Sequence, residues 1–247
     1  EQYLWDGTFH WGEWTEPKKR LEDGTWFDPV MSDPMVWFGA DKGEIGTAYY
    51  YLSVSTIAKI ADILGKKEEA AEYRELADRI LDAWRTEYMS EDGRVASRSQ
   101  AGYVRALAFG LAPEHQRAAV AGHLAQLIAD AGDHLTTGFL ATPLLLPVLA
   151  DAGNADLAYR LLFQRSYPSW LTMIDRGATT IWENWEGVDE NGVADASLNH
   201  YSKGAVVHFL HTHTAGIRLM EDSPGYGRFL VRPVPGGGLT WAEASLD

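Results

Sequence analysis

The stretch Tyr49-Tyr-Tyr-Leu-Ser-Val-Ser-Thr-Ile-Ala-Lys-Ile-Ala-Asp-Ile-Leu-Gly65 decides the fold of this 247-residue chain. Its apolar side chains recur at helical steps, and Gly65 ends the pattern as glycine commonly ends a helix. The expected buried side consists of Tyr49, Leu52, Ile57, Ile60, Ala61 and Leu64. The sequence therefore predicts a long amphipathic helix from about Gly43 onward.

A second helix follows almost at once. Its first turns carry Glu68, Glu69 and Glu72, where the helix dipole favours negative charge. Apolar positions then recur at steps of three and four: Tyr73, Leu76, Ala77, Ile80, Leu81 and Trp84. A turn is expected at 90–93. Gly or Pro separates most of the further predicted helices, at 100–111, 113–130, 143–151, 155–164 and 199–220.

These helices alternate between short and long connections, and no strand pattern is evident before the last twenty residues. Such an order favours antiparallel helical hairpins and an all-α class. A ring of hairpins is the natural arrangement, although periodicity alone does not distinguish it from a helical solenoid. Residues 229–234 and 239–244 predict two short strands joined by a Gly-rich turn. Since a lone hairpin is barely stable, we expect the strands to begin a β domain, with a helical domain at 1–221 and a β domain at 222–247.

Composition restricts the classes of protein. With 46% hydrophobic and 23% charged residues, the chain has enough apolar material for a single large core. The net charge of -14 and the lack of a basic stripe argue against a nucleic-acid partner. No run of about 18 apolar residues suggests a membrane segment. The absence of cysteine excludes disulfides, thiolate nucleophiles and Cys-based zinc sites.

The first 43 residues differ from the rest because they show no helical period. They hold five of the ten tryptophans, Trp5, Trp11, Trp14, Trp26 and Trp37. Long irregular segments in compact domains are usually functional loops or disordered, and so many aromatic residues fit disorder poorly. We expect a binding surface here. The alternative is that these rings merely cover the core.

The first six residues show no secretion signal, but a trimmed chain would have lost one, so cytoplasmic and secreted locations both stay open.

Most of the candidate functional residues lie in two segments, Gly177-Ala-Thr-Thr-Ile-Trp-Glu-Asn-Trp-Glu186 and Ser197-Leu-Asn-His-Tyr201. Glu183 stands between Trp182 and Trp185, whose rings can exclude water and raise the pKa of a carboxylate. Asn199 and His200 can hydrogen-bond hydroxyl groups. This mixture suits sugar chemistry, and Glu183 is the first candidate for a catalytic base.

Glycoside hydrolysis typically needs two carboxyl groups, and their separation decides whether the anomeric configuration is inverted or retained. Glu186 lies close to Glu183 in sequence. Glu13, in Trp11-Gly-Glu-Trp14, repeats the arrangement of a carboxylate between tryptophans. The alternative for Glu13 and Glu183 is a helix cap or a loop hydrogen bond.

Other chemistries find less support. His208, His211 and His213 suggest a metal, but no acidic residue nearby completes a ligand spacing, so a packed or solvated helix face is preferred. The run Gly236–Gly238 lacks the context of a phosphate loop, and no nucleophile elbow occurs. Neither a metal nor a cofactor is expected.

The motifs Tyr167-Pro-Ser-Trp170, Gly177–Glu183, Ser197–Tyr201 and Gly204-Ala205 resemble the C-terminal half of the catalytic domain in bacterial α-L-rhamnosidases of glycoside hydrolase family 78. The likeness extends more weakly along most of the chain. Trp11–Trp14 is similar to the Gly-Asp-Trp pocket loop of the family, and Pro224-Gly-Tyr226 is similar to the start of its C-terminal β-sandwich.

The resemblance implies a partial (α/α)6 barrel, with its N-terminal helices missing, and an inverting mechanism on terminal α-L-rhamnosyl units. Glu183 would be the general base and His200 a residue of the sugar pocket, while Glu13 and Trp14 would belong to the pocket wall. The acidic motif that supplies the family's general acid has no match here, and its upstream β-sandwich domains are absent. We therefore expect a fragment that is nearly inactive alone and that associates with itself or with the missing N-terminal part.

Two alternatives stay open at this point. One is an (α/α)6 hydrolase that acts on another glycan, because a fold does not fix a substrate. The other is a non-catalytic remnant that binds a sugar.

Overall fold

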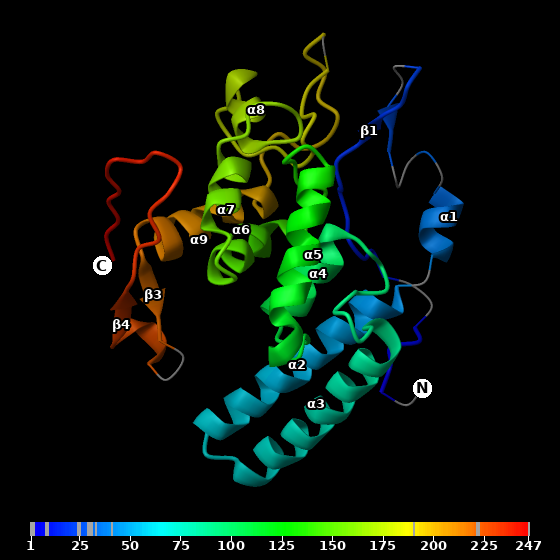
Figure 1. Ribbon diagram of the computed structural model, residues 1–247, viewed down its shortest axis with the longest axis vertical. Helices are drawn as coiled ribbons and strands as arrows, with labels where there is room; N and C mark the ends of the chain where they lie inside the picture. The colour runs from blue at the N-terminus through cyan, green and yellow to red at the C-terminus, as the bar shows by residue number, and fades with distance from the viewer. Residues whose placement is uncertain are drawn as a thin grey trace. The chain divides into compact units, whose positions relative to one another are not determined.

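The computed structural model describes residues 3–7, 10–23, 26–28, 32, 34–40, 42–189, 191–220 and 223–246 (Figure 1). The chain forms two compact units. The first consists of Glu1–Trp14 and Lys18–Leu124, and the second of Thr15–Pro17 and Ala125–Asp247. The expected boundary between residues 221 and 222 lies outside the described residues and stays a prediction.

The first unit contains a long antiparallel hairpin of α2 (Gly43–Ile63) and α3 (Lys67–Tyr88), which run side by side in Figure 1. The expected helices are confirmed. In α3 the expected face is confirmed as well, since Ala77, Ile80 and Trp84 are buried. Ala77 and Ile80 form a core cluster with Val54 of α2.

The expected buried face of α2 is wrong in part. Ile57, Ile60 and Leu64 are 43%, 50% and 65% exposed. The residues buried from this helix are Gly43, Glu44, Thr47, Ala48, Val54, Ala58 and Ala61. Apolar residues occur on more than one side of α2, so its periodicity alone did not select the correct one. The structure buries a side rich in small residues, which permit close helix packing.

The remaining helices of the first unit are shorter. The helix α4 (Gln100–Ala108) begins where the Ser99 side chain accepts a hydrogen bond from Gly102 N, and nearly all of it is buried. The 3₁₀ turn η1 (Glu114–Gln116) leads into α5 (Arg117–Asp130), which belongs to the first unit up to Leu124 and to the second from Ala125 onward. Three short elements were not expected from sequence: α1 (Pro34–Gly39) and the paired strands β1 (Lys19–Arg20) and β2 (Trp26–Phe27).

The second unit begins with a helical hairpin of α6 (Thr142–Asp151) and α7 (Ala155–Leu162). The short α8 (Trp170–Asp175) follows, and it was not expected from sequence. After a long loop, the 3₁₀ turn η2 (Ser202–Ala205), α9 (Val206–Phe209) and the π-helical turn η3 (Leu210–Thr214) form one continuous helical segment. Both η2 and α9 pack against α6 (Figure 1).

The helix expected at 199–220 therefore begins later and ends earlier. Gly216 has a φ of +85°, and a Cβ there would lie 2.2 Å from the backbone nitrogen of Pro233. This conformation and close approach require glycine and stop the helix. The following residues turn into the strand β3 (Ile217–Leu219).

The C-terminal strands pair differently from the expectation. The strand β4 (Phe229–Val231) pairs antiparallel with β3, with Arg218 opposite Leu230, and residues 239–244 form no strand. The 3₁₀ turn η4 (Pro224–Tyr226) precedes β4. The Tyr159 hydroxyl of α7 donates to the carbonyl of Val234 at 2.7 Å, so it ties the segment after β4 to the helices of this unit. Within the described ranges, no helix has both the length and the apolar composition of a bilayer span.

Candidate active site

Glu183 lies in a loop whose backbone pairs with the segment that carries Ser197. Glu183 N donates to Ser197 O at 2.9 Å, and His200 N donates to Ile181 O at 2.8 Å. Ser197 N in turn donates to Glu183 Oε2 at 3.1 Å. The carboxyl group is thus held by a backbone N–H while the residue stays partly exposed. The structure brings together the two motifs that the sequence analysis singled out.

The tryptophans on either side of Glu183 are packing residues. Trp182 and Trp185 are 4% and 1% exposed. The ring of Trp185 meets Trp170 edge to face, with centroids 5.4 Å apart. Trp182 covers Gly187, where a Cβ would lie 1.7 Å from the indole ring. Both rings therefore support the loop from within instead of presenting an open face.

Asn199 and His200 stand on the segment paired with Glu183. The imidazole of His200 stacks on Phe139 and on Tyr201, with centroids 4.7 and 5.0 Å apart and interplanar angles of 19° in both cases. His200 Nδ1 accepts a hydrogen bond from Ser202 N at 3.3 Å. Asn199 is exposed, and its backbone N–H donates to Ser197 Oγ at 3.2 Å. Both residues therefore lie on the segment that pairs with the Glu183 loop.

The second carboxylate of the motif, Glu186, is tied to another quoted motif. The hydroxyl of Tyr167, in Tyr167-Pro-Ser-Trp170, donates to Glu186 Oε1. Arg176 donates to the backbone carbonyls of Glu186 and Val188. These contacts fix the loop on the C-terminal side of Glu183.

Sequence reasoning missed Lys203. This side chain is 1% exposed, and its Nζ donates to the backbone carbonyl of Glu183. Nζ also lies 4.9 Å from the ring centroid of Trp185 and 5.0 Å from that of Phe139. Burial lowers the pKa of Lys203 to about 7, while the charges of Glu186 and Glu183 act in the opposite direction. The available signal was a lysine two residues after the Ser197–Tyr201 motif.

Glu13 and Trp14 belong to the first unit, whereas the Glu183 cluster belongs to the second. Glu13 is buried, and its Oε2 lies 2.6 Å from Arg105 Nη1; Arg105 Nη2 lies 3.4 Å from Glu44 Oε1. The structure therefore places Glu13 in an ion pair, in line with the alternative of a loop interaction. The Trp14 ring packs edge to face against Trp11, with centroids 4.4 Å apart.

Of the three histidines near the end of the helical part, His213 has side-chain partners that the structure defines. His213 is buried, with Nδ1 2.8 Å from Thr212 Oγ1 and Nε2 3.2 Å from Asp151 Oδ1. Asp151 also accepts from Arg218 at 2.9 Å. These interactions give His213 a structural explanation. Across the described part of the chain, no group of three or more His, Asp or Glu residues could hold a metal ion.

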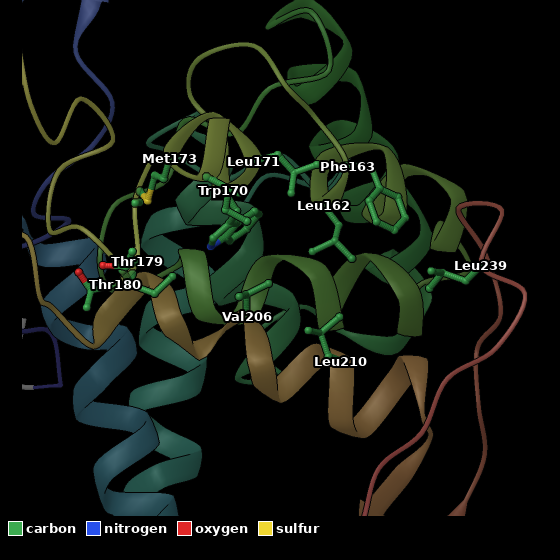
Figure 2. A pocket seen from close by; sticks show the side chains of 13 residues that line it. Leu162, Phe163, Trp170, Leu171, Met173, Thr179, Thr180, Val206, Leu210 and Leu239 are labelled. Atoms are coloured by element: carbon green, nitrogen blue, oxygen red, sulfur yellow. The ribbon is translucent and has the colours of Figure 1, made fainter. Parts of the chain in front are cut away.

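An apolar hollow of about 510 Å³ lies in the second unit, close to the Glu183 loop (Figure 2). Figure 2 shows Leu162 and Phe163 from the end of α7, Trp170 from α8, and Val206 and Leu210 from the α9 segment around it. Ile181, two residues before Glu183, also lines the hollow. Its walls are mainly apolar, and Thr179 and Thr180 contribute the side-chain hydroxyl groups among the lining residues, so it is less polar than expected of a sugar site (Figure 2).

Comparison with known proteins places the chain in a family. Residues 2–214 match the bacterial α-L-rhamnosidase six-hairpin glycosidase domain, and residues 216–247 match the bacterial α-L-rhamnosidase C-terminal domain. The chain belongs to the bacterial α-L-rhamnosidase six-hairpin glycosidase family. This confirms the suggested resemblance and, with the helical hairpins described above, the expected fold class.

Individual relatives agree with this assignment. An α-L-rhamnosidase of Streptomyces avermitilis is 43% identical over 209 residues, which cover 83% of this chain and 20% of that protein. A crystal structure of Streptomyces avermitilis α-L-rhamnosidase complexed with L-rhamnose matches with a TM-score of 0.81 at 38% identity, over 96% of this chain and 21% of that one. The α-L-rhamnosidase of Aspergillus terreus matches with a TM-score of 0.82 at 30% identity, over 95% and 26%. The chain thus spans about a fifth to a quarter of these relatives.

Proposed function

We propose that this chain forms part of the catalytic domain of a glycoside hydrolase that removes terminal α-L-rhamnosyl units. The membership of the six-hairpin glycosidase family supports this proposal, and a relative of known structure was crystallised with L-rhamnose. The observation that carries it is the placement of Glu183, a partly exposed carboxylate on a loop fixed by Ser197 and Lys203.

In the proposed mechanism Glu183 is the general base. It takes a proton from a water molecule that attacks the anomeric carbon, and the configuration of that carbon is inverted. Ser197 N–H stabilises the ionised carboxylate through Oε2, which leaves Oε1 as the oxygen that receives the proton. We assign Asn199 and His200 to hydroxyl groups of the sugar, because they share the Glu183 loop cluster. Trp182 and Trp185 would act by holding that cluster in place.

Glu13 and Trp14 are proposed as part of the pocket wall, with the ion pair to Arg105 fixing the position of Glu13. The acid that protonates the leaving oxygen is proposed to come from a part of the longer enzyme outside these residues. Two observations support this: the chain spans 20% of its Streptomyces avermitilis relative, and no family-like acidic motif occurs in it. Loss of one such group typically lowers a rate about 100- to 10,000-fold, so the chain alone should be nearly inactive.

The test is Glu183→Gln in the full-length enzyme, assayed with an aryl α-L-rhamnoside. We expect cleavage to fall at least about 100-fold with the thermal midpoint unchanged. Glu91→Gln, at an exposed turn, serves as the matched control and should keep full activity. Unchanged turnover by Glu183→Gln would remove this residue from the mechanism. The stereochemistry of the first product, followed by NMR, tests inversion.

A second candidate function is sugar binding without chemistry. It predicts that the full-length protein binds L-rhamnose but releases no aryl group, and calorimetry beside the cleavage assay separates the two. The third candidate function is hydrolysis of another glycan. A panel of aryl glycosides that differ only in the sugar tests it, because such an enzyme would cleave a glycoside of another sugar faster than the rhamnoside.

A further inference from the structure

Lys203 is a chargeable side chain at a buried position, and packing alone does not explain why a lysine occupies it. Its side chain is 1% exposed and enclosed by the rings of Phe139 and Trp185. Burying an ammonium group costs free energy, whereas a methionine of similar length would fill the same space without that cost. The retained lysine therefore provides something that an apolar residue does not.

The first contribution is mechanical. Lys203 Nζ donates to the carbonyl of Glu183, so η2 and the Glu183 loop are joined through this side chain. Trp170 Nε1 donates to Lys203 O at 2.9 Å, which ties the same residue to α8. Lys203 is thereby held at both ends, and the loop position depends on it.

The second contribution is electrostatic. The carboxylates of Glu186 and Glu183 favour the charged form of Lys203. The other polar groups facing this cluster are Tyr167, which donates to Glu186, and Arg176, which donates to the Glu186 backbone. The aromatic rings around Nζ attract the cation and exclude water, which strengthens both effects.

We propose that Lys203 is a positioning residue for the reaction at Glu183: from inside its aromatic enclosure it fixes the backbone of that residue through the hydrogen bond to the Glu183 carbonyl. This inference rests on the proposed role of Glu183 as the base. The hydrogen bond holds the Glu183 backbone at the position from which its side chain reaches the attacking water.

The experiment compares Lys203→Met and Lys203→Arg in the full-length enzyme. Values of kcat and KM for an aryl α-L-rhamnoside are measured from about pH 4 to about pH 9, with the thermal midpoint as a separate readout. Lys42→Met is the matched control. Lys42 is also buried, at 8% exposure, donates from Nζ to Trp37 O at 2.7 Å and lies 5.4 Å from the Trp37 ring, but it belongs to the first unit.

For Lys203→Met we expect kcat to fall about 100-fold with KM changed less than about threefold, since a small displacement of a catalytic group has effects of this size. The kcat of Lys203→Met should stay low across the whole pH range, because no change of protonation restores the lost hydrogen bond to the Glu183 carbonyl. Lys203→Arg should recover part of kcat, since it can donate to the same carbonyl. Lys42→Met should leave kcat unchanged.

The proposal is overturned if Lys203→Met lowers only the thermal midpoint and keeps the wild-type kcat. Glu183→Gln separates this failure from that of the proposed function. An inactive Glu183→Gln beside an unaltered kcat in Lys203→Met rejects the role of Lys203 alone. An active Glu183→Gln rejects the role of Glu183, and the inference about Lys203 with it.

Discussion

Arg105 Nη1 lies 2.6 Å from Glu13 Oε2, and the two side chains are 1% and 5% exposed. Arg105 also reaches Glu44, whose Oε2 accepts a hydrogen bond from Ser97 N at 3.0 Å. One arginine thus joins the tryptophan-rich N-terminal segment to α2 and α4. Arg105 is the cation shared by Glu13 and Glu44, so both carboxylates depend on it, because isolated charges are very costly to bury.

Replacing Arg105 by methionine should lower the free energy of unfolding by about 3–5 kcal/mol, since two buried carboxylates lose their cation. The matched control is Arg165→Met. Arg165 Nη1 is also 2.6 Å from its partner, Asp175 Oδ1, but these side chains are 67% and 44% exposed. That change should cost less than about 1 kcal/mol. Urea unfolding measures both, and equal losses would contradict the argument from burial.

The dependence of stability on pH should contain a contribution from Lys203. Burial lowers its pKa to about 7 in the folded protein, against the ordinary value of 10.5. Between these values the unfolded chain binds more protons, so the free energy of unfolding should rise with pH, by at most about 1.4 kcal/mol per pH unit.

Lys203→Met removes that rise, whereas Lys67→Met, at a lysine whose side chain is 74% exposed, should retain it. Urea midpoints measured at several values between about pH 7 and about pH 10 check this expectation. The same slope in wild type and Lys203→Met would show that Lys203 does not titrate in this window.

Gly216→Ala should damage the junction between η3 and β3. Alanine at a φ of +85° costs about 1–2 kcal/mol, and the added Cβ meets the backbone of Pro233 at 2.2 Å. Gly153→Ala isolates the conformational part, because Gly153 has a φ of +83° with no atom within 4 Å of the added Cβ. We expect Gly216→Ala to destabilise by about 1–3 kcal/mol more than Gly153→Ala. Equal thermal midpoints for the two variants would contradict this reading.

The isolated chain should self-associate. Exposed apolar side chains at the end of α2 include Ile60 and Ile63, at 50% and 73% exposure, and Leu64 just after the helix is 65% exposed. The second unit carries the apolar hollow of Figure 2. Large exposed apolar patches favour association. Sedimentation velocity at several concentrations should show species larger than a 27.4 kDa monomer. A single monomeric species across that range would oppose the prediction, and Ile60→Lys should reduce the association.

The sequence predicted helices best where periodicity and end signals agreed. Residues 67–88 show an apolar period of three and four residues, acidic first turns and a preceding Gly65, and the structure confirms both the helix and its buried face. On α2 the same reasoning found the helix but chose the wrong side, because apolar residues surround much of it. The spacing of Ile57 and Ile60 is typical of a buried helical face, but spacing does not show whether another segment packs on that face. In the structure both side chains stay exposed.

For the candidate site, the sequence by itself determined which segments are proposed, because carboxylates between tryptophans and a nearby Asn-His pair are local features. The family match confirms the resemblance that these motifs suggested. Only the tertiary structure decided what each residue contacts: Ser197 holds Glu183, Arg105 pairs with Glu13, and Lys203 lies beneath the Glu183 loop. Those contacts join residues 14 to 92 positions apart, where local periodicity carries no information. Long-range contacts determine which residues are buried, which charges pair and which strands become neighbours. Helix formation and turn type depend mainly on residues close together in the sequence.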